Sequence, residues 1–196
     1  MATTSPDAAA LYAVQTSSAQ AAAQAAAQAA DLPDLSSPPG PLALRAALGR
    51  FATGVTIVTC RDADGTAVGL TANSFAALSL DPPLVLWSLR CASASAAAFS
   101  AAGHFAVNVL ADTQVDLSRR FASPVADKFA EGPWLAGLGG APVLSACAAV
   151  FECALASQQV AGDHLLFIGR VLRLTDLSVA PLVFQGGHYR MLGEVL

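Results

Sequence analysis

The sequence has few charged residues and a single lysine. Of its 196 residues 12% are charged, and ten basic residues against fourteen acidic ones give a formal net charge of -4. Binding to a phosphate backbone needs a clustered positive field, which basic residues scattered along the chain do not supply. We therefore expect no nucleic-acid partner.

Local metal-binding and membrane-spanning patterns are also missing. The four cysteines form no CxxC pair and the three histidines stand far apart, which argues against a local zinc-finger arrangement, though not against ligands assembled in space. We expect no metal site. Reduced, mostly buried thiols are typical of a cytoplasmic protein. Apolar residues make up 55% of the chain, yet no uninterrupted run of about 20 of them predicts a membrane-spanning helix. The residues concerned are Cys60, Cys91, Cys147, Cys153, His104, His164 and His188.

The common signatures of nucleotide-binding and hydrolytic enzymes are absent. The chain contains no GxGxxG after a strand, no GxxxxGK[ST], no GxSxG and no HExxH. A dinucleotide-binding Rossmann domain, a P-loop enzyme, a serine hydrolase of the elbow type and a zinc protease are therefore disfavoured.

Composition divides the chain into a tail and one domain. Residues 1–40 are rich in Ala, Gln, Ser and Pro and contain no Lys or Arg, which is typical of a disordered low-complexity tail. Residues 41–196 are long enough to bury a full core and are expected to form a single domain.

Within that domain the pattern predicts mainly strands. Residues 55–60 and 66–74 flank an Asp/Gly turn and should pair as a hairpin, and residues 84–89 follow a double proline as an apolar strand. Further strands are expected over residues 104–110, 149–160 and 164–177, with an apolar segment over 181–192. Because these strands do not alternate regularly with helices, an antiparallel barrel with helical covers fits better than a doubly wound sheet.

Short helices and one loop complete the prediction. A helix should follow Pro41 and end near Gly54, with its leucines and Phe51 on one side. A second should start at a cap on Ser93 or Ser95 and stop at Gly103, and a third should open with an Asp112 cap. Residues 123–142, rich in Gly and Pro, are expected to form a loop.

A cluster of small polar side chains interrupts the apolar strands. Thr71, Asn73 and Ser74 precede a turn, Ser88 lies near the end of the next strand, and Ser93 and Ser95 follow at a helix start. Neutral donors beside a helix start suit a ligand with a polar-edged aromatic ring and a phosphate, which Arg90 and Arg119 or Arg120 would complete. The alternative is that these side chains only cap helices and bridge turns.

Two turns can likewise be interpreted either as structural or as ligand-binding. His164 follows the turn residues Gly162 and Asp163 and enters an apolar strand, where a lone histidine is often structural. Gly186 and Gly187 precede His188 and Tyr189, as in a hairpin turn; they would also let a flat ligand approach the backbone, with Tyr189 available to stack.

Six segments together resemble the short-chain NAD(P)H:flavin reductases. Their order and spacing match that family over about residues 42–192, and the combination is far more specific than any single segment. The segments are RFATGVTIVTC, GLTANSFAALSLDPPLVLWSL, HFAVNVL, DKF, AGDHLLFIGRV and PLVFQGGHYRML.

The resemblance implies a fold and an activity. The family has the FMN-binding split-barrel fold, mainly antiparallel β with short helices, and assembles as a homodimer. Its members transfer hydride from NADH or NADPH to FMN or FAD and supply the reduced flavin to a partner monooxygenase. A non-catalytic flavin- or haem-binding split-barrel module is the alternative, and oxidation of a phosphorylated pyridoxine-like substrate is a third possibility.

The resemblance also implies site residues. His164 is the candidate catalytic residue, expected to orient the nicotinamide, and Cys91 departs from the family at a position where many relatives carry a basic or amide residue. The expected cofactor-binding residues are Gly69, Leu70, Thr71, Asn73, Ser74, Ser88, Leu89, Arg90, Ser93, Ser95, Arg120, Phe121, Asp163, His164, His188 and Tyr189.

Overall fold

The computed structural model describes residues 37–194. The chain divides into two compact units, residues 1–44 and 45–196, and each is considered by itself. The expected tail over residues 1–40 lies outside the described residues except for 37–40. No helix within residues 37–194 is long and apolar enough to cross a membrane.

The described part of the chain is mainly β, with three short α-helices and one 3₁₀ turn. The helices are α2 (Pro41–Leu48), α3 (Ala96–Ala101) and α4 (Val115–Ala122), and the 3₁₀ turn is η1 (Leu138–Gly140).

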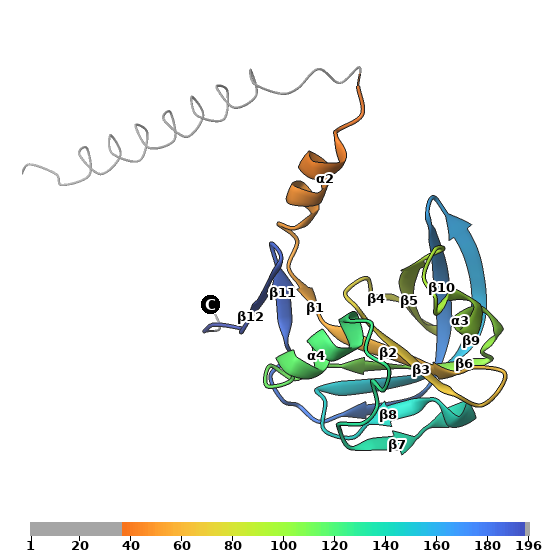
Figure 1. Ribbon diagram of the computed structural model, residues 1–196. Coiled ribbons are helices and arrows are strands. Elements are labelled where there is room, and N and C mark those ends of the chain that lie inside the picture. Colours follow the sequence, from red (N-terminus) through yellow and green to blue (C-terminus); the bar gives the residue numbers. More distant parts are fainter. Residues whose placement is uncertain (1–36, 195–196) are drawn as a thin grey trace, which may run out of the picture. The chain divides into compact units, whose positions relative to one another are not determined.

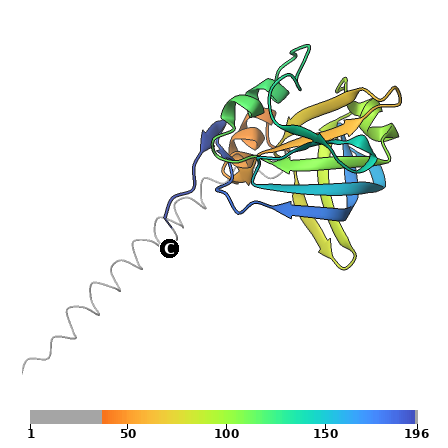
Figure 2. The same ribbon diagram turned by 90° about the horizontal axis from the view of Figure 1, so that it is seen from below.

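A seven-stranded antiparallel sheet forms most of the second unit (Figures 1 and 2). Figure 2 shows its strands side by side, and the longest of them, β9 and β10, form one hairpin. In spatial order the strands are β3 (Ala67–Ala72), β2 (Thr56–Arg61), β6 (His104–Val109), β9 (Ala149–Ala161), β10 (His164–Asp176), β5 (Pro83–Arg90) and β4 (Ala76–Leu80).

Two small antiparallel sheets accompany it. One joins β1 (Thr53–Gly54) to the hairpin of β11 (Val183–Gln185) and β12 (His188–Arg190), and the other pairs β7 (Trp134–Ala136) with β8 (Pro142–Leu144). The β11–β12 turn needs glycine, because Gly186 and Gly187 have φ angles of 58° and 83°, which side chains rarely adopt.

The core follows from how the strands bury their side chains. Residues 56–60 of β2 are all buried, as in a strand covered on both faces, whereas β5 alternates and turns Val85, Trp87 and Leu89 inward. Trp87 stacks on Phe167 of β10 with ring centroids 4.6 Å apart. A second buried cluster forms around Ile57 of β2 and residues of α4, β8 and β9.

The strand predictions over residues 55–60, 66–74, 84–89, 104–110, 149–160 and 164–177 are confirmed, with small shifts at the ends. The predicted turn before a last strand is also confirmed, because β11 and β12 pair across it. The prediction for the first helix is wrong at its end. The helix stops at Leu48, before Gly49, and residues 53–54 pair with β11 instead of continuing it.

Three further strands, which were not predicted, form by pairing with a strand nearby in the sequence. Strand β4 was not predicted, because its Ala, Leu and Ser residues have weak strand preference and it forms by pairing with β5. Strands β7 and β8 lie within or overlap the expected loop over 123–142, where they pair with each other.

The predicted serine cap is confirmed in its position but makes no side-chain hydrogen bond, and the predicted Asp112 cap is wrong. Ser95 occupies the N-cap position of α3 without a side-chain hydrogen bond, and Gln114 rather than Asp112 occupies that of α4. The Ser93 hydroxyl instead accepts a hydrogen bond from the Ser95 N–H at 3.3 Å, and Gln114 Oε1 accepts one from the Ala111 N–H at 2.9 Å. Both side chains therefore stabilise the turn that leads into the helix.

Candidate functional site

Ser74, in the short connection between β3 and β4, is bonded to Ser88 of strand β5, a contact called the Ser74–Ser88 clip below. Its hydroxyl donates to the Ser88 carbonyl at 2.9 Å and accepts from the Ser88 N–H at 3.0 Å. Strands β3 and β5 are not ladder neighbours in the sheet, so this double contact ties them together where no ladder does. Two of the expected site residues are thereby brought together, and the protein uses the hydroxyl hydrogen of Ser74 and one of its two lone pairs.

The polar side chains beside this clip have free hydrogen-bonding capacity. Asn73 is exposed, and among the described residues its amide has no hydrogen-bond partner in the protein. Thr71 is half-buried and donates its hydroxyl hydrogen to the Ser118 carbonyl at 2.6 Å. A ligand at the end of β3 would therefore find an amide able to donate and accept, and a Thr71 oxygen able only to accept.

Gly69 serves close packing. A Cβ atom on Gly69 would lie 2.7 Å from Cε1 of Phe121 and 3.0 Å from Cζ of Phe129. Phe121 is 1% exposed and also packs against Phe129 and Trp134, with centroids 5.0 and 5.3 Å away. Phe121 therefore holds α4 against β3 as a core residue, and its ring is not open to solvent.

Three more expected residues are parts of strands: Leu70 lies on β3, and Ser88 and Leu89 lie on β5. Leu70 is half-buried against the core cluster that contains Leu89, which is itself 8% exposed. Their backbone groups take part in the sheet ladders, in which Leu70 stands opposite Val58 and Leu89 opposite Leu165.

The charged turn between β9 and β10 lies beside the end of β5. In the sheet register His164 stands opposite Arg90, and the Cys91 N–H donates to the Asp163 carbonyl at 2.9 Å. His164 Nδ1 lies 2.7 Å from Asp163 Oδ1. This hydrogen bond and the charge of His164, with a smaller contribution from Arg90, lower the pKa of the Asp163 carboxyl.

Ionisation of Asp163 fixes the histidine tautomer. A carboxylate only accepts hydrogen bonds, so Nδ1 of His164 carries a hydrogen and donates it to Asp163. The remaining ring nitrogen, Nε2, is left for another partner. The turn thus presents one oriented imidazole beside the exposed Arg90 guanidinium.

The turn that leads into helix α3 contains Ser93 and Ser95 and follows Arg90. The Ser93 N–H donates to the Arg90 carbonyl at 2.9 Å, and the six-residue helix α3 begins just after Ser95. Both serines are half-buried. The turn therefore carries their hydroxyls next to Arg90, which is the only cation among these residues.

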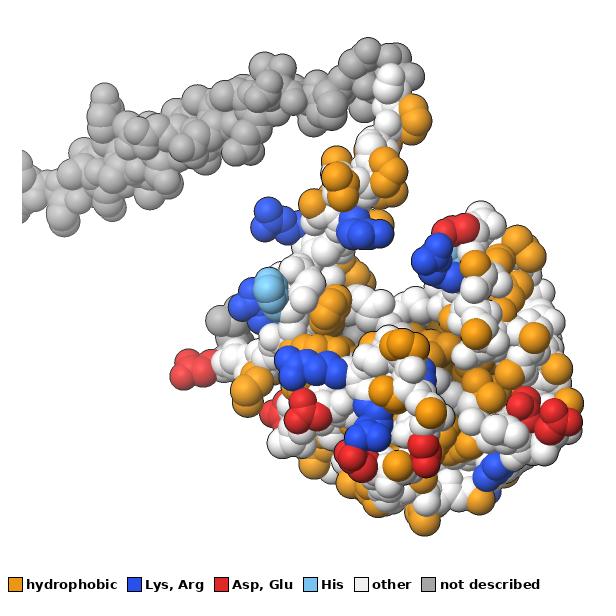
Figure 3. Space-filling model, in the orientation of Figure 1, with side chains coloured by type: hydrophobic (Ala, Val, Ile, Leu, Met, Phe, Trp, Pro, Cys, Tyr) orange, Lys and Arg blue, Asp and Glu red, His pale blue; other side chains and the backbone are white. Residues whose placement is uncertain are grey.

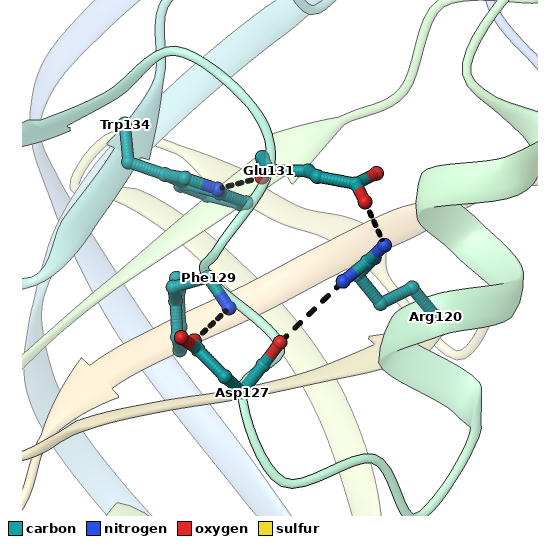
Figure 4. A network of polar contacts seen from close by, with 5 residues as sticks. All are labelled: Arg120, Asp127, Phe129, Glu131 and Trp134. Carbon is teal, nitrogen blue, oxygen red and sulfur yellow. Dashed lines mark hydrogen bonds and ion pairs between the residues drawn. The ribbon is translucent and has the colours of Figure 1, made fainter.

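Arg120 lies apart from that turn, at the end of α4 (Figure 4). Its guanidinium forms an ion pair with Glu131 and donates to the Asp127 carbonyl at 3.5 Å. The Trp134 indole N–H donates to the Glu131 carbonyl at 2.8 Å. Arg120 therefore fastens the segment after α4, and its charge is already paired with a carboxylate.

Two further expected residues, His188 and Tyr189, lie in the β11–β12 hairpin. The Tyr189 hydroxyl lies 2.9 Å from Oγ of Ser118, and the Arg119 guanidinium stands over the Tyr189 ring, 5.7 Å from its centroid. His188 is exposed. Ser118 thus joins Tyr189 to Thr71, because its carbonyl accepts from Thr71 while its hydroxyl meets Tyr189.

Ser118 is a residue that the sequence reading missed. It is fully buried on α4, and a signal was present, since it lies three positions before Phe121 and therefore on the same helical face. A serine on a buried face needs a hydrogen-bond partner, which its position alone does not name.

The expected site residues thus form separate groups within one chain. The first includes Thr71 and Tyr189, linked by Ser118, and the second includes Arg90, Asp163 and His164. The Ser74–Ser88 clip lies along β5 from the second group. Figure 1 shows the β9–β10 turn and strand β12 on opposite sides of the second unit, so His164 and Tyr189 are not brought together within it.

Comparison with known proteins identifies the family. Residues 48–193 match the family described as a flavin reductase like domain. A protein of Rhizobium meliloti (strain 1021) named "Probable flavin reductase" is 48% identical over 149 residues, which are 76% of this chain and 48% of that protein. The reductase component of a flavin-dependent trigonelline monooxygenase from Acinetobacter baylyi is 44% identical over 147 residues, or 74% of this chain and 47% of that protein.

A solved structure is similar over most of its length. The NADH:FAD oxidoreductase SgcE6 of Streptomyces globisporus, in complex with NAD and FAD fragments, matches with a TM-score of 0.76 and 35% identity. The match covers 80% of this chain and 95% of that one. The chain spans about half the length of the two curated relatives above. With three quarters of its sequence matched, the chain belongs to the flavin reductase like domain family.

Proposed function

We propose that the chain is an NAD(P)H:flavin oxidoreductase that reduces FMN or FAD with NADH or NADPH and supplies the reduced flavin to a partner monooxygenase. The observation that carries the proposal is the likeness to SgcE6, a NADH:FAD oxidoreductase whose structure holds NAD and FAD fragments. The trigonelline monooxygenase reductase component supports the partner. We assign the activity to the domain over residues 41–196.

The side chains at the ends of β3 and β5 suit a flavin. The edge of its ring system carries both donors and acceptors, which the Asn73 amide and the Thr71 oxygen can match. Its phosphate needs a cation and hydroxyl donors, and Arg90 stands next to Ser93 and Ser95. We propose that these residues bind the flavin, while Gly69, Phe121 and the Ser74–Ser88 clip hold the strands that carry them.

The role of the protein in hydride transfer is positional. The bound flavin supplies an acceptor for the hydride, and the reacting atoms must lie about 3 to 3.5 Å apart. No general base is needed at the transferred hydrogen. We propose that His164, oriented by Asp163, presents Nε2 to the nicotinamide nucleotide, and that His188 and Tyr189 border the same ligand.

The sheet is proposed to be a split barrel. Its two edge strands, β3 and β4, are joined by only three residues, 73–75, which span about 10 Å when fully extended. One end of each edge strand must therefore lie near the other, and a sheet whose edges approach in this way curls towards closure.

An apolar surface supports a homodimer. Figure 3 shows hydrophobic side chains exposed on the face of the second unit that it presents. An exposed patch of this kind marks an interaction surface, and a second copy of the chain is the occupant we propose. Sedimentation as an active monomer at micromolar concentration would contradict it. Exposed large apolar side chains lie on β4 (Leu78, Leu80), on β10 (Leu172, Leu174) and just after β10 (Leu177, Val179).

The activity can be tested directly with the purified protein. NADH or NADPH is mixed with FMN, FAD or riboflavin, and the loss of absorbance at the nicotinamide band is followed. We expect oxidation of at least one nucleotide that depends on added flavin. A yellow protein that oxidises neither nucleotide would instead be a flavin-binding module without this activity.

A variant tests the role of His164. The change His164→Ala should raise the KM for the nicotinamide nucleotide about tenfold, the value of one hydrogen bond to a polar ligand, with a smaller change in the flavin Kd. Gln159→Ala is a matched control, because Gln159 is exposed on the same hairpin opposite Leu166. Loss of flavin binding with normal use of the nucleotide would show that His164 has a different role.

A further inference from the structure

We propose that Ser118 is a positioning residue that fixes strand β12, and with it Tyr189, relative to strand β3. The inference rests on the proposed function, in which β3 carries a flavin contact and Tyr189 borders the nicotinamide nucleotide. Ser118 itself touches neither ligand. It lies within the matched residues 48–193 but outside the six quoted segments, and only the folded structure places it between these two strands.

On one side Ser118 is bonded to β3 through its backbone. The Thr71 hydroxyl donates to the Ser118 carbonyl at 2.6 Å, across 47 positions of sequence. The same helix packs against β3 through Phe121, whose ring fills the space above Gly69. Helix α4 is therefore held at a fixed distance from β3 at this point.

On the other side Ser118 is bonded to β12 through its side chain. Its Oγ lies 2.9 Å from the Tyr189 hydroxyl, across 71 positions of sequence, and Ser118 is fully buried. A buried hydroxyl that loses its partner is costly, so the two hydroxyls keep the spacing between α4 and β12. The Arg119 guanidinium over the Tyr189 ring adds a second contact from the same helix.

Strand β12 is held by few hydrogen bonds, although the Tyr189 ring also packs against Phe184, with ring centroids 5.5 Å apart, and against the buried cluster around Ile57. It is an edge strand that pairs only with β11, over three residue pairs. Among the described residues, the bond to Ser118 is the only hydrogen bond made by a β12 side chain. A three-residue edge strand opens at low free-energy cost, so a single buried side-chain bond has a large effect on its position.

The two halves of this link can be removed separately. Ser118→Ala deletes the hydroxyl and keeps the carbonyl that Thr71 needs, and Tyr189→Phe deletes the other hydroxyl and keeps the ring under Arg119. We expect either change to raise the KM for the nicotinamide nucleotide roughly two- to tenfold, as for the loss of one neutral hydrogen bond, while the flavin Kd stays at the wild-type value. The double variant should match the single ones, because both remove the same bond.

Ser123→Ala is the matched control. Its hydroxyl donates to the Arg119 carbonyl at 2.8 Å at the exposed end of the same helix, so its loss should leave the KM unchanged. Urea unfolding of each variant separates a loss of stability from a change in positioning. If Ser118→Ala fails to fold, Tyr189→Phe tests the same bond at a half-buried residue.

The outcomes separate this inference from the proposed function. A wild-type protein that oxidises no nicotinamide nucleotide overturns the function itself. An active wild type together with folded variants of unchanged KM, or with additive effects in the double variant, overturns only the role of Ser118.

Discussion

Replacing Gly69 with alanine places a methyl group against the ring of Phe121. The new carbon would lie 2.7 Å from Cε1 and 3.1 Å from Cδ1 of that ring, and 3.0 Å from Phe129. Carbon atoms in contact normally lie about 3.5 to 4.0 Å apart, so the rings must move by about 1 Å. Phe121 is almost fully buried and cannot move freely. Overpacking of this kind costs about 1 to 3 kcal/mol.

Urea unfolding measures this cost as a free energy, and thermal melting measures it as a change in Tm. For a chain of this size, a loss of 1 kcal/mol lowers the Tm by about 2 to 4 °C, so Gly69→Ala should melt roughly 2 to 12 °C below the wild type. Gly103→Ala is the control, because a Cβ there meets nothing within 4 Å. Its stability should stay within about 0.5 kcal/mol of the wild type.

A second substitution identifies the ring as the cause. In a Phe121→Leu background the smaller side chain leaves room for the methyl group, so Gly69→Ala should cost less there than in the wild type. The reasoning would be refuted if the substitution cost the same in both backgrounds, or if it abolished flavin binding with no loss of stability. The second result would place Gly69 directly against the ligand.

Two further predictions concern titration and thiol reactivity. NMR titration should place the midpoint of Asp163 below the ordinary 3.8, because its pKa is lowered mainly by the hydrogen bond from His164; the stability it contributes is therefore present above 3.8 and lost as the pH falls through the lowered value. His164→Ala should return the midpoint towards 3.8. A thiol reagent should modify one cysteine in the native chain and four in denaturant, and Cys91→Ser should remove the native reaction, because Cys91 is exposed. Burial raises the pKa of the other thiols, to about 12 for Cys60, about 11 for Cys147 and about 12 for Cys153.

Most strands could be predicted because each carries its own local pattern. The hairpin of β9 and β10 has long apolar strands on both sides of Gly162, whose φ of 62° suits glycine. Strand β4 has no such pattern, since its side chains are mostly exposed and its pairing with β5 defines it. The end of α2 likewise depends on β11, which pairs with residues 53–54.

The candidate site could be predicted as a set of residues but not as an arrangement. Thr71, Asn73 and Ser74 stand next to each other in the sequence, yet Thr71 donates to α4, Ser74 clips β5 and Asn73 has no protein partner. Arg120 is expected at the flavin from the family resemblance, and its ion pair with Glu131 is a contact that the sequence does not indicate. Each difference depends on which element packs against the side chain.

The sequence by itself determined most of the strands, the glycine turns and the family, because periodicity, turn chemistry and motif order are properties of neighbouring residues. The tertiary structure alone decided what Ser118 and Gly69 do. Ser118 meets partners 47 and 71 positions away, and Gly69 makes room for a ring on α4. Such contacts depend on how the helix packs on the completed sheet, and that packing is set by the whole core and not by any one segment.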